Sequence, residues 1–242
     1  MTSSNDGSSD GSPNAGPNAD SNGDIQKDGH IREKLVATKE KWAREGRALT
    51  GETADPQRDR LPPGQRLVED WPVLDLGIVP RVTTENWTLT VDGLVENPIR
   101  WAWANFQAQP QERFLSDIHC VTTWSRYDNH WEGIGTRRLL EILRPKPEAR
   151  VVVCHSSDGY TTNLPLEAFA AEDALLATTW EGKPISRDHG GPVRVVVPKL
   201  YFWKSAKWVK RLEFLASDRR GYWEVRGYHN DADPWKEERY SE

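Results

Sequence analysis

Sulfur-containing residues are scarce in this chain. Its 242 residues include two cysteines, Cys120 and Cys154, and a single methionine. Because the two thiols lie far apart and form no Cys-x-x-Cys pair, the sequence excludes a disulfide framework and a structural zinc site with the usual ligand spacing. So few cysteines suit a reducing compartment.

The sequence also has no segment that would cross or target a membrane. No stretch approaches the roughly eighteen consecutive apolar residues that a spanning helix needs. The first thirty residues contain neither an apolar export segment nor a twin-arginine signal. We therefore expect a cytoplasmic protein without a membrane span.

Basic charge is not in excess. The formal net charge is −5, and the first 24 residues contain four aspartates but no lysine or arginine. The rest of the chain is therefore nearly neutral. A nearly neutral domain has no overall field that attracts nucleic acid, so we expect no nucleic-acid partner.

Composition divides the chain into three parts. Residues 1–30 form an acidic tail of Ser, Asn, Gly and Asp with too few apolar residues to offset the entropy of ordering, so we predict disorder there. Residues 31–61 contain a predicted helix over 31–46, followed by a linker. Residues 62–242 are long enough to bury a core, and we predict one domain there.

The predicted elements mix strands and helices without a regular β-α-β rhythm. Alternating or β-branched runs predict strands at residues 87–91, 151–154, 193–197 and 208–214. Helical patterns lie at residues 101–109, 136–143 and 165–178. We also predict a turn at Asp92–Gly93 and a helix cap at Thr136. This irregular order favours an α+β fold over a doubly wound α/β fold.

The first candidate functional stretch surrounds Cys120, at residues 117–125. A thiolate is a soft ligand that suits a soft or highly covalent metal centre, so Cys120 is a candidate metal ligand. The alternative is a small buried apolar residue, which is the commoner role of a lone cysteine. Cys154 lies in a valine-rich run, and we expect it to be a buried, inert thiol.

The second candidate stretch is basic and rich in glycine at its start. Residues 193–211 contain six basic residues and no acidic residue, and Gly190–Gly191 precede them. The basic residues are Arg194, Lys199, Lys204, Lys207, Lys210 and Arg211. Paired glycines allow close approach of backbone amides to an anion, so this pattern indicates an anionic ligand. A solvated basic face or a single-stranded nucleic-acid site are the alternatives.

The third candidate stretch follows the strand predicted at residues 151–154. Residues 154–163 provide hydroxyl groups, the carboxylate of Asp158 and the phenol of Tyr160. Loops at strand ends often carry function, so these side chains could line a pocket. An Asp-Gly turn between two strands explains the same residues equally well.

Five segments together resemble the sulfite oxidase-like molybdopterin-dependent oxidoreductases. They are residues 117–125, Trp131-Glu132-Gly133, residues 159–163, residues 189–192 and residues 203–208. The C-terminal residues 227–230 and 233–240 resemble the small prokaryotic branch of this family, which has no haem domain. The resemblance covers roughly residues 62–242 and implies that this segment is a mixed-sheet, molybdopterin-binding domain of the sulfite oxidase type.

The resemblance also implies a function and a set of site residues. It implies two-electron oxygen-atom transfer on a small oxyanion or sulfoxide-like substrate, with molybdenum and molybdopterin as cofactors and a separate electron-transfer partner. Cys120 would bind molybdenum, and Tyr160 would lie on the substrate side. The residues implied to bind the cofactor are Asp75, Leu76, Ser156, Asp158, His189, Arg194, Ser205, Ala206 and Lys207. A non-catalytic anion- or nucleotide-binding module on the same fold is the alternative.

Overall fold

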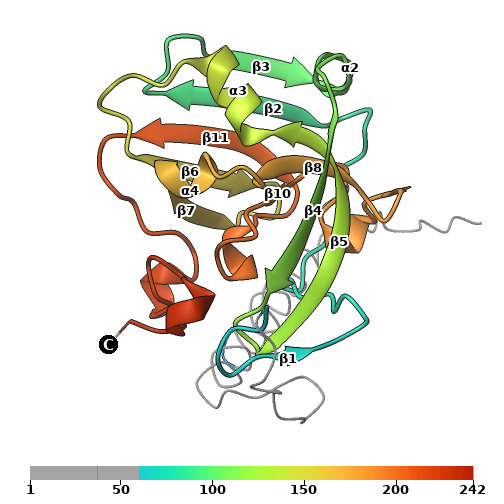
Figure 1. Ribbon diagram of the computed structural model, residues 1–242. Helices are drawn as coiled ribbons and strands as arrows, with labels where there is room; N and C mark the ends of the chain where they lie inside the picture. Colours follow the sequence, from blue (N-terminus) through green and yellow to red (C-terminus); the bar gives the residue numbers. More distant parts are fainter. Residues whose placement is uncertain (1–36, 38–59, 242) are drawn as a thin grey trace, which may run out of the picture.

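The structure is a computed structural model that describes residue 37 and residues 60–241. The tail predicted at residues 1–30 lies outside the described residues, and so does the helix predicted at 31–46 apart from residue 37. None of the helices among the described residues is long and apolar enough to cross a membrane. The described chain folds into two β-sheets with short helices between strands (Figure 1).

The first sheet contains six strands within residues 60–241, in the order β1-β5-β8-β10, with β4 paired to β5 and β9 to β8. The strands are β1 (Arg66–Leu67), β4 (Glu112–His119), β5 (Trp124–Gly135), β8 (Leu175–Trp180), β9 (Lys183–Pro184) and β10 (Arg194–Val196). β4 and β5 form the long antiparallel ribbon drawn in green in Figure 1. His119 pairs with Ser125, so residues 120–123 form the tight turn that closes this ribbon.

The second sheet contains five strands within the same residues, in the order β3-β2-β11-β6-β7. The strands are β2 (Thr88–Gly93), β3 (Ile99–Ala102), β6 (Val151–Ser156), β7 (Thr161–Pro165) and β11 (Val209–Leu215). β11 pairs with β2 in parallel, and the other neighbours are antiparallel. The mixed sheets confirm the predicted α+β class.

Short helices connect these strands. The α-helices are α2 (Trp103–Gln107), α3 (Thr136–Leu143) and α4 (Leu166–Phe169). Four 3-10 turns follow later, at η1 (Arg187–His189), η2 (Phe202–Lys204), η3 (Glu224–Arg226) and η4 (Pro234–Lys236). The helices predicted at residues 101–109 and 136–143 are confirmed as α2 and α3.

The helix predicted at residues 165–178 is wrong. Only α4 is helical, and residues 175–180 form the strand β8. This strand pairs with β5 on one side and β10 on the other. Leu175, Leu176 and Ala177 are completely buried there. The hydrogen bonds and burial that two neighbouring strands provide override a helical pattern in the local sequence.

Two smaller predictions also need correction. Asp92 and Gly93 continue β2, because Gly93 pairs with Phe214 of β11, and the chain turns only afterwards. Thr136 is the first residue of α3, not its cap, and its hydroxyl donates a hydrogen bond to the Ala174 carbonyl oxygen at 3.0 Å. In both cases, a contact with a distant part of the chain replaced the local turn or capping interaction.

One apolar core joins the two sheets. Leu89 of β2, Ile134 of β5, Val152 of β6 and Phe214 of β11 are fully buried members of the same cluster. The continuous apolar run at residues 151–154 is buried throughout, as the sequence predicts. The core therefore holds the end of the β4–β5 ribbon in a fixed position relative to the second sheet.

The close packing of β5 on β8 gives a first testable prediction. A β-carbon built on Gly133 would collide with the backbone carbonyl oxygen of Leu176, and a backbone group cannot rotate away. We expect Gly133→Ala to lower the free energy of unfolding by about 1–3 kcal/mol. Chemical denaturation followed by tryptophan fluorescence measures this change. An unchanged unfolding midpoint would contradict the described register of β5 and β8.

Candidate functional site

One pocket brings the three candidate stretches together. Its cavity volume is about 120 Å³, which is room for more than one water molecule. Ten of the eleven predicted site residues line it: Asp75, Leu76, Cys120, Ser156, Asp158, Tyr160, His189, Arg194, Ser205 and Lys207. Ala206 is the exception. It is buried behind the wall, where its carbonyl oxygen accepts a hydrogen bond from the Val195 amide at 2.8 Å.

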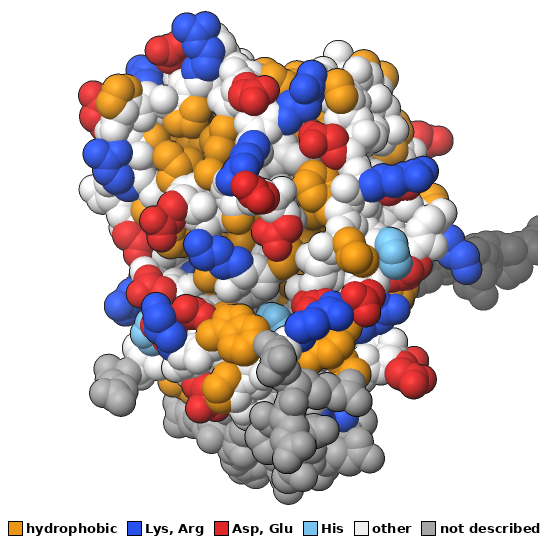
Figure 2. Space-filling model, viewed as in Figure 1, with side chains coloured by type: hydrophobic (Ala, Val, Ile, Leu, Met, Phe, Trp, Pro, Cys, Tyr) orange, Lys and Arg blue, Asp and Glu red, His pale blue; other side chains and the backbone are white. Residues whose placement is uncertain are grey.

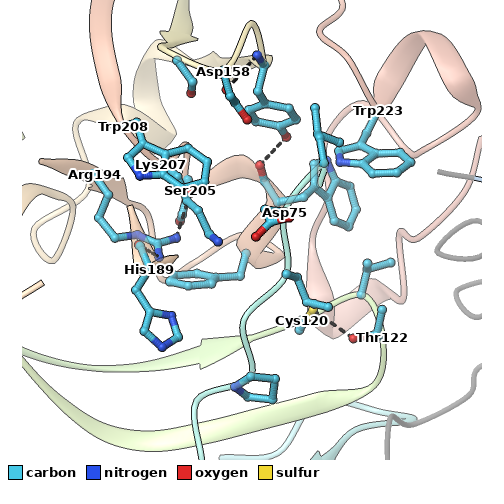
Figure 3. A pocket seen from close by; sticks show the side chains of 18 of the residues that line it. Asp75, Cys120, Thr122, Asp158, His189, Arg194, Ser205, Lys207, Trp208 and Trp223 are labelled. Atoms are coloured by element: carbon cyan, nitrogen blue, oxygen red, sulfur yellow. Dashed lines mark hydrogen bonds between the residues drawn. The ribbon is translucent and has the colours of Figure 1, made fainter. Parts of the chain in front are cut away.

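Four loops and the extended segment 71–76, which supplies Asp75 and Leu76, build most of the pocket (Figure 3). The β4–β5 turn supplies Cys120, and the hairpin between β6 and β7 supplies Ser156, Asp158 and Tyr160. The segment from η1 to β10 supplies His189 and Arg194, and the loop before β11 supplies Ser205 and Lys207. Asp158 and Gly159 do form a turn between strands, so both interpretations of residues 154–163 describe the same hairpin.

Backbone hydrogen bonds hold Cys120 in its turn. The Cys120 amide donates to the Trp124 carbonyl oxygen at 2.8 Å, and the Thr123 amide donates to the Cys120 carbonyl oxygen at 3.0 Å. Cys120 is 5% exposed and forms no disulfide. Its sulfur lies 3.1 Å from the hydroxyl oxygen of Thr122. The thiol is therefore placed at the pocket wall by a rigid turn.

Arg194 braces two of the pocket loops. Its guanidinium donates to the carbonyl oxygens of His189 at 2.7 Å and Ser205 at 2.9 Å. The guanidinium carbon lies 5.1 Å from the ring centroid of Trp71 and 4.4 Å from that of Phe202. Burial lowers the pKa of Arg194 to about 9, so the side chain keeps its positive charge at neutral pH.

His189 is a neutral side chain in the pocket wall. Its ring stacks on Trp71 with the centroids 3.8 Å apart. Burial, and then the charges of Arg194 and Lys207, lower the pKa of His189 to about 4. Gly190, with φ +104°, follows it, and a β-carbon there would lie 2.8 Å from the Lys207 β-carbon. This close approach brings the His189 segment against the lysine.

Several buried polar groups at the pocket have no hydrogen-bond partner among the described residues. They are the Ser156 hydroxyl, the His189 Nδ1 atom and the Trp124 indole nitrogen. Buried polar groups in native proteins are nearly always paired, because an unpaired group costs its desolvation energy. Three such groups in the wall of one pocket, together with Arg194 and Lys207, indicate a ligand with several polar atoms and negative charge.

Tyr160 is held at a fixed position in the wall. Its hydroxyl donates to the Trp203 carbonyl oxygen at 2.6 Å. Burial raises the pKa of Tyr160 well above its ordinary value, so the phenol stays protonated. The phenol oxygen can therefore accept a hydrogen bond from a ligand while its O–H group donates to the Trp203 carbonyl oxygen.

An aromatic wall completes the pocket, and the site prediction did not include it. Trp203, Trp223 and Tyr228 line the cavity together with Trp71. The ring of Tyr228 lies 5.0 Å from that of Trp203 and 4.7 Å from that of Trp223. Two signals of this wall were present in the sequence: the twelve tryptophans, and the positions of Trp203 and Tyr228 in the resembling segments 203–208 and 227–230.

A buried ion pair supports this wall from behind. Lys204 and Glu224 have fully buried side chains, with Nζ and Oε1 2.7 Å apart. The same Glu224 oxygen accepts hydrogen bonds from the Trp203 indole at 3.0 Å and the Thr162 hydroxyl at 2.9 Å. Burial lowers the pKa of Lys204, and the neighbouring Glu224 carboxylate acts in the opposite direction.

This arrangement corrects the interpretation of the basic stretch at residues 193–211. Among its six basic residues, only Arg194 and Lys207 line the pocket. Lys204 pairs with Glu224, and Arg211 pairs with Asp92 on the neighbouring strand β2 of the second sheet. The basic residues separate in space because the stretch passes from β10 through the 3-10 turn η2 and its flanking loops to β11.

Comparison with known proteins places the chain among oxidoreductases. Residues 76–223 match the family described as oxidoreductase molybdopterin binding domain. An uncharacterized oxidoreductase of Bacillus subtilis, YuiH, is 43% identical over 186 residues, which cover 76% of this chain and 94% of that protein.

More distant relatives are larger. The protein-methionine-sulfoxide reductase catalytic subunit MsrP of Campylobacter jejuni is 27% identical over 62% of this chain, which spans 56% of that protein. The crystal structure of the sulfane dehydrogenase SoxCD from Paracoccus pantotrophus is similar with a TM-score of 0.52 and 21% identity, over 57% of this chain and 40% of that one. The likeness to SoxCD concerns the fold.

The buried ion pair gives the second prediction. We expect Lys204→Met to destabilise the fold by about 3–5 kcal/mol, because the Glu224 carboxylate would lose its buried partner. The matched control is Arg113→Met, which breaks the exposed pair with Glu132 and should cost no more than about 1 kcal/mol. Urea denaturation of both variants tests this difference. Equal, small losses would show that the Lys204–Glu224 pair does not hold the wall.

Proposed function

Since the chain belongs to the oxidoreductase molybdopterin-binding domain family and is thus a molybdenum-dependent oxidoreductase, we propose that Cys120 is the protein ligand of its metal. We propose that the enzyme transfers an oxygen atom to or from a small sulfoxide-like substrate. The observation that carries this proposal is the position of Cys120 in the same pocket as Arg194 and Lys207. Family membership sets aside the alternative of a non-catalytic binding module.

The pocket residues fit the cofactor chemically. Molybdopterin carries a phosphate and a polar pterin ring. The pocket wall offers the two cations Arg194 and Lys207. It also offers three buried polar groups that have no hydrogen-bond partner among the described residues. When bound, the cofactor supplies two-electron chemistry for oxygen-atom transfer between water and substrate. Cys154 is unsuited as a ligand, because complete burial raises the pKa of its thiol to about 12.

We propose a division of the pocket into a cofactor part and a substrate part. The cofactor's phosphate and pterin would be bound by Arg194, Lys207 and His189. The Ser156 hydroxyl would form a hydrogen bond with the pterin ring. Ser205 and Lys207 would contribute further contacts, with Asp75, Leu76 and Asp158 at the edge, whereas Ala206 lies behind the wall. Tyr160 and the aromatic wall would face the substrate, with the Tyr160 oxygen as a hydrogen-bond acceptor.

The charges of the pocket favour an uncharged substrate over an oxyanion. Among the described residues that line it, Arg194 and Lys207 are the only cations, and both are proposed to bind the cofactor. Asp75 and Asp158 supply negative charge, and the remaining wall is largely aromatic. An anion such as sulfite would find no further positive charge here. The relative MsrP is named for the reduction of methionine sulfoxide in proteins, which is an uncharged sulfoxide.

The proposal extends to the whole chain. Residues 62–242 would form the cofactor-binding domain, which includes the 76–223 match, and a separate partner would exchange electrons with it. We further propose a cytoplasmic location, which the two buried thiols outside any disulfide support.

The ligand role of Cys120 is tested by its replacement with serine. The protein should be purified from a host that makes molybdopterin, together with Cys154→Ser as the matched control. We expect Cys120→Ser to fold, to lose at least about a hundredfold in turnover and to change the spectrum of the metal. Cys154→Ser should keep the turnover and the metal spectrum of the wild type. Full turnover or an unchanged metal spectrum in Cys120→Ser would contradict the ligand role.

The substrate preference is tested by comparing the reduction of a methyl sulfoxide, assayed with a reduced dye as electron donor, with the oxidation of sulfite, assayed with an oxidised dye as electron acceptor. We expect the sulfoxide to have at least about a fivefold higher kcat/KM, because a like charge about 4 Å away costs about 1 kcal/mol even in water. The variant Asp158→Asn keeps the side-chain oxygen that accepts a hydrogen bond from the Tyr160 amide, but it removes the negative charge. It should therefore reduce the difference in kcat/KM between the sulfoxide and sulfite. A wild-type preference for sulfite would overturn the proposed substrate class.

A further inference from the structure

We propose that Thr122 is a positioning residue that donates a hydrogen bond to the Cys120 sulfur and thereby raises the reduction potential of the metal. The proposal rests on the ligand role of Cys120 proposed above. Thr122 lies in the wall of the cavity, but it is not among the site residues predicted from the sequence.

The geometry places the hydroxyl directly beside the sulfur. The Thr122 oxygen and the Cys120 sulfur are 3.1 Å apart, as the dashed line in Figure 3 shows. Among the described residues, this sulfur is the only hydrogen-bond partner of the Thr122 hydroxyl. Thr122 is 2% exposed, so solvent does not compete for the proton. A hydrogen bond in a buried site is electrostatically stronger than one in water.

The direction of the hydrogen bond follows from the chemistry of the ligand. A cysteine that binds a metal does so as a thiolate, which has no proton to donate. The hydroxyl of Thr122 must therefore be the donor, and the sulfur must accept. A thiolate that accepts a hydrogen bond gives less electron density to its metal, which favours the reduced metal. Hydrogen bonds to sulfur ligands and their surroundings are known to set reduction potentials in metalloproteins.

The turn that carries both residues is fixed from outside. The Cys120 carbonyl oxygen accepts from the Gln65 amide group at 3.0 Å, and the Thr123 carbonyl oxygen accepts from the Arg66 amide at 2.9 Å. Between them, the Val121 carbonyl oxygen accepts from the Arg239 guanidinium at 2.7 Å.

These partners lie on segments far from the turn in sequence, and they restrain three of its four carbonyl groups. The backbone that carries Cys120 and Thr122 is therefore held in place on both sides of Thr122. The neighbouring Thr123, with φ +70°, is also buried, but its hydroxyl has no partner among the described residues. It thus provides a control of the same residue type.

The test compares reduction potentials of three variants. Thr122→Val removes the hydroxyl but keeps the shape of the side chain, Thr122→Ser keeps the hydroxyl, and Thr123→Val removes the control hydroxyl. Each is purified from a molybdopterin-competent host and titrated with redox mediators while the metal is followed by electron paramagnetic resonance. Molybdenum content and unfolding midpoints are measured in parallel.

We expect Thr122→Val to bind molybdenum normally but to have a lower potential. The shift should be on the order of a tenfold change in the ratio of oxidised to reduced metal, which is about 59 mV for a one-electron couple. Thr122→Ser and Thr123→Val should match the wild type. A purely structural role of Thr122 would change stability without this pattern.

Two other outcomes separate this inference from the proposed function. An unchanged potential in Thr122→Val, while Cys120→Ser alters the metal spectrum, would overturn the role of Thr122 and leave the ligand role standing. An unchanged spectrum in Cys120→Ser would overturn the proposed function itself. Equal shifts in Thr122→Val and Thr123→Val would assign the effect to packing of the turn and would also overturn the inference.

Discussion

The pocket depends on one buried cation. Arg194 is 2% exposed, and its guanidinium holds the His189 and Ser205 carbonyl oxygens while it lies between the rings of Trp71 and Phe202. Hydrogen bonds from Lys207 and Trp208 to the Asp188 and Arg187 carbonyl oxygens join the same two loops, and Arg194 is the buried charged group among these contacts. The same charge, with that of Lys207, makes the cavity suitable for an anionic cofactor. Arg194 thus supports the pocket structurally and also supplies part of its positive charge.

A second constraint fixes the position of Cys120 in the pocket wall. The β4–β5 ribbon ends in a turn whose carbonyl oxygens bond to Gln65, Arg66 and Arg239, segments that lie far from the turn in sequence. Cys120 therefore reaches the pocket from a rigid support, as a metal ligand requires. The aromatic wall from the C-terminal segment, supported by the Lys204–Glu224 pair, shapes the remaining space.

The sequence alone predicted the parts whose signal is local. The valine-rich strand at residues 151–154 and the α+β class are confirmed, and the motifs led to residues that line one pocket. The helix expected at residues 165–178 failed because β8 exists only through its pairing with β5 and β10. Lys204 was counted with the anion-binding residues because its partner, Glu224, could not be seen from the sequence. Thr122 lies in the candidate stretch 117–125, but its contact with the Cys120 sulfur could not be predicted, since that contact depends on the shape of the turn.

The central claim is that the Cys120 sulfur binds the metal, and X-ray absorption at the molybdenum edge tests it most directly. The spectrum counts the sulfur atoms around molybdenum in the wild type and in Cys120→Ser, both from a molybdopterin-competent host and both shown to be folded. The account predicts one sulfur neighbour fewer in the variant. The same number of sulfur neighbours in both proteins would contradict it, whatever the activity of either.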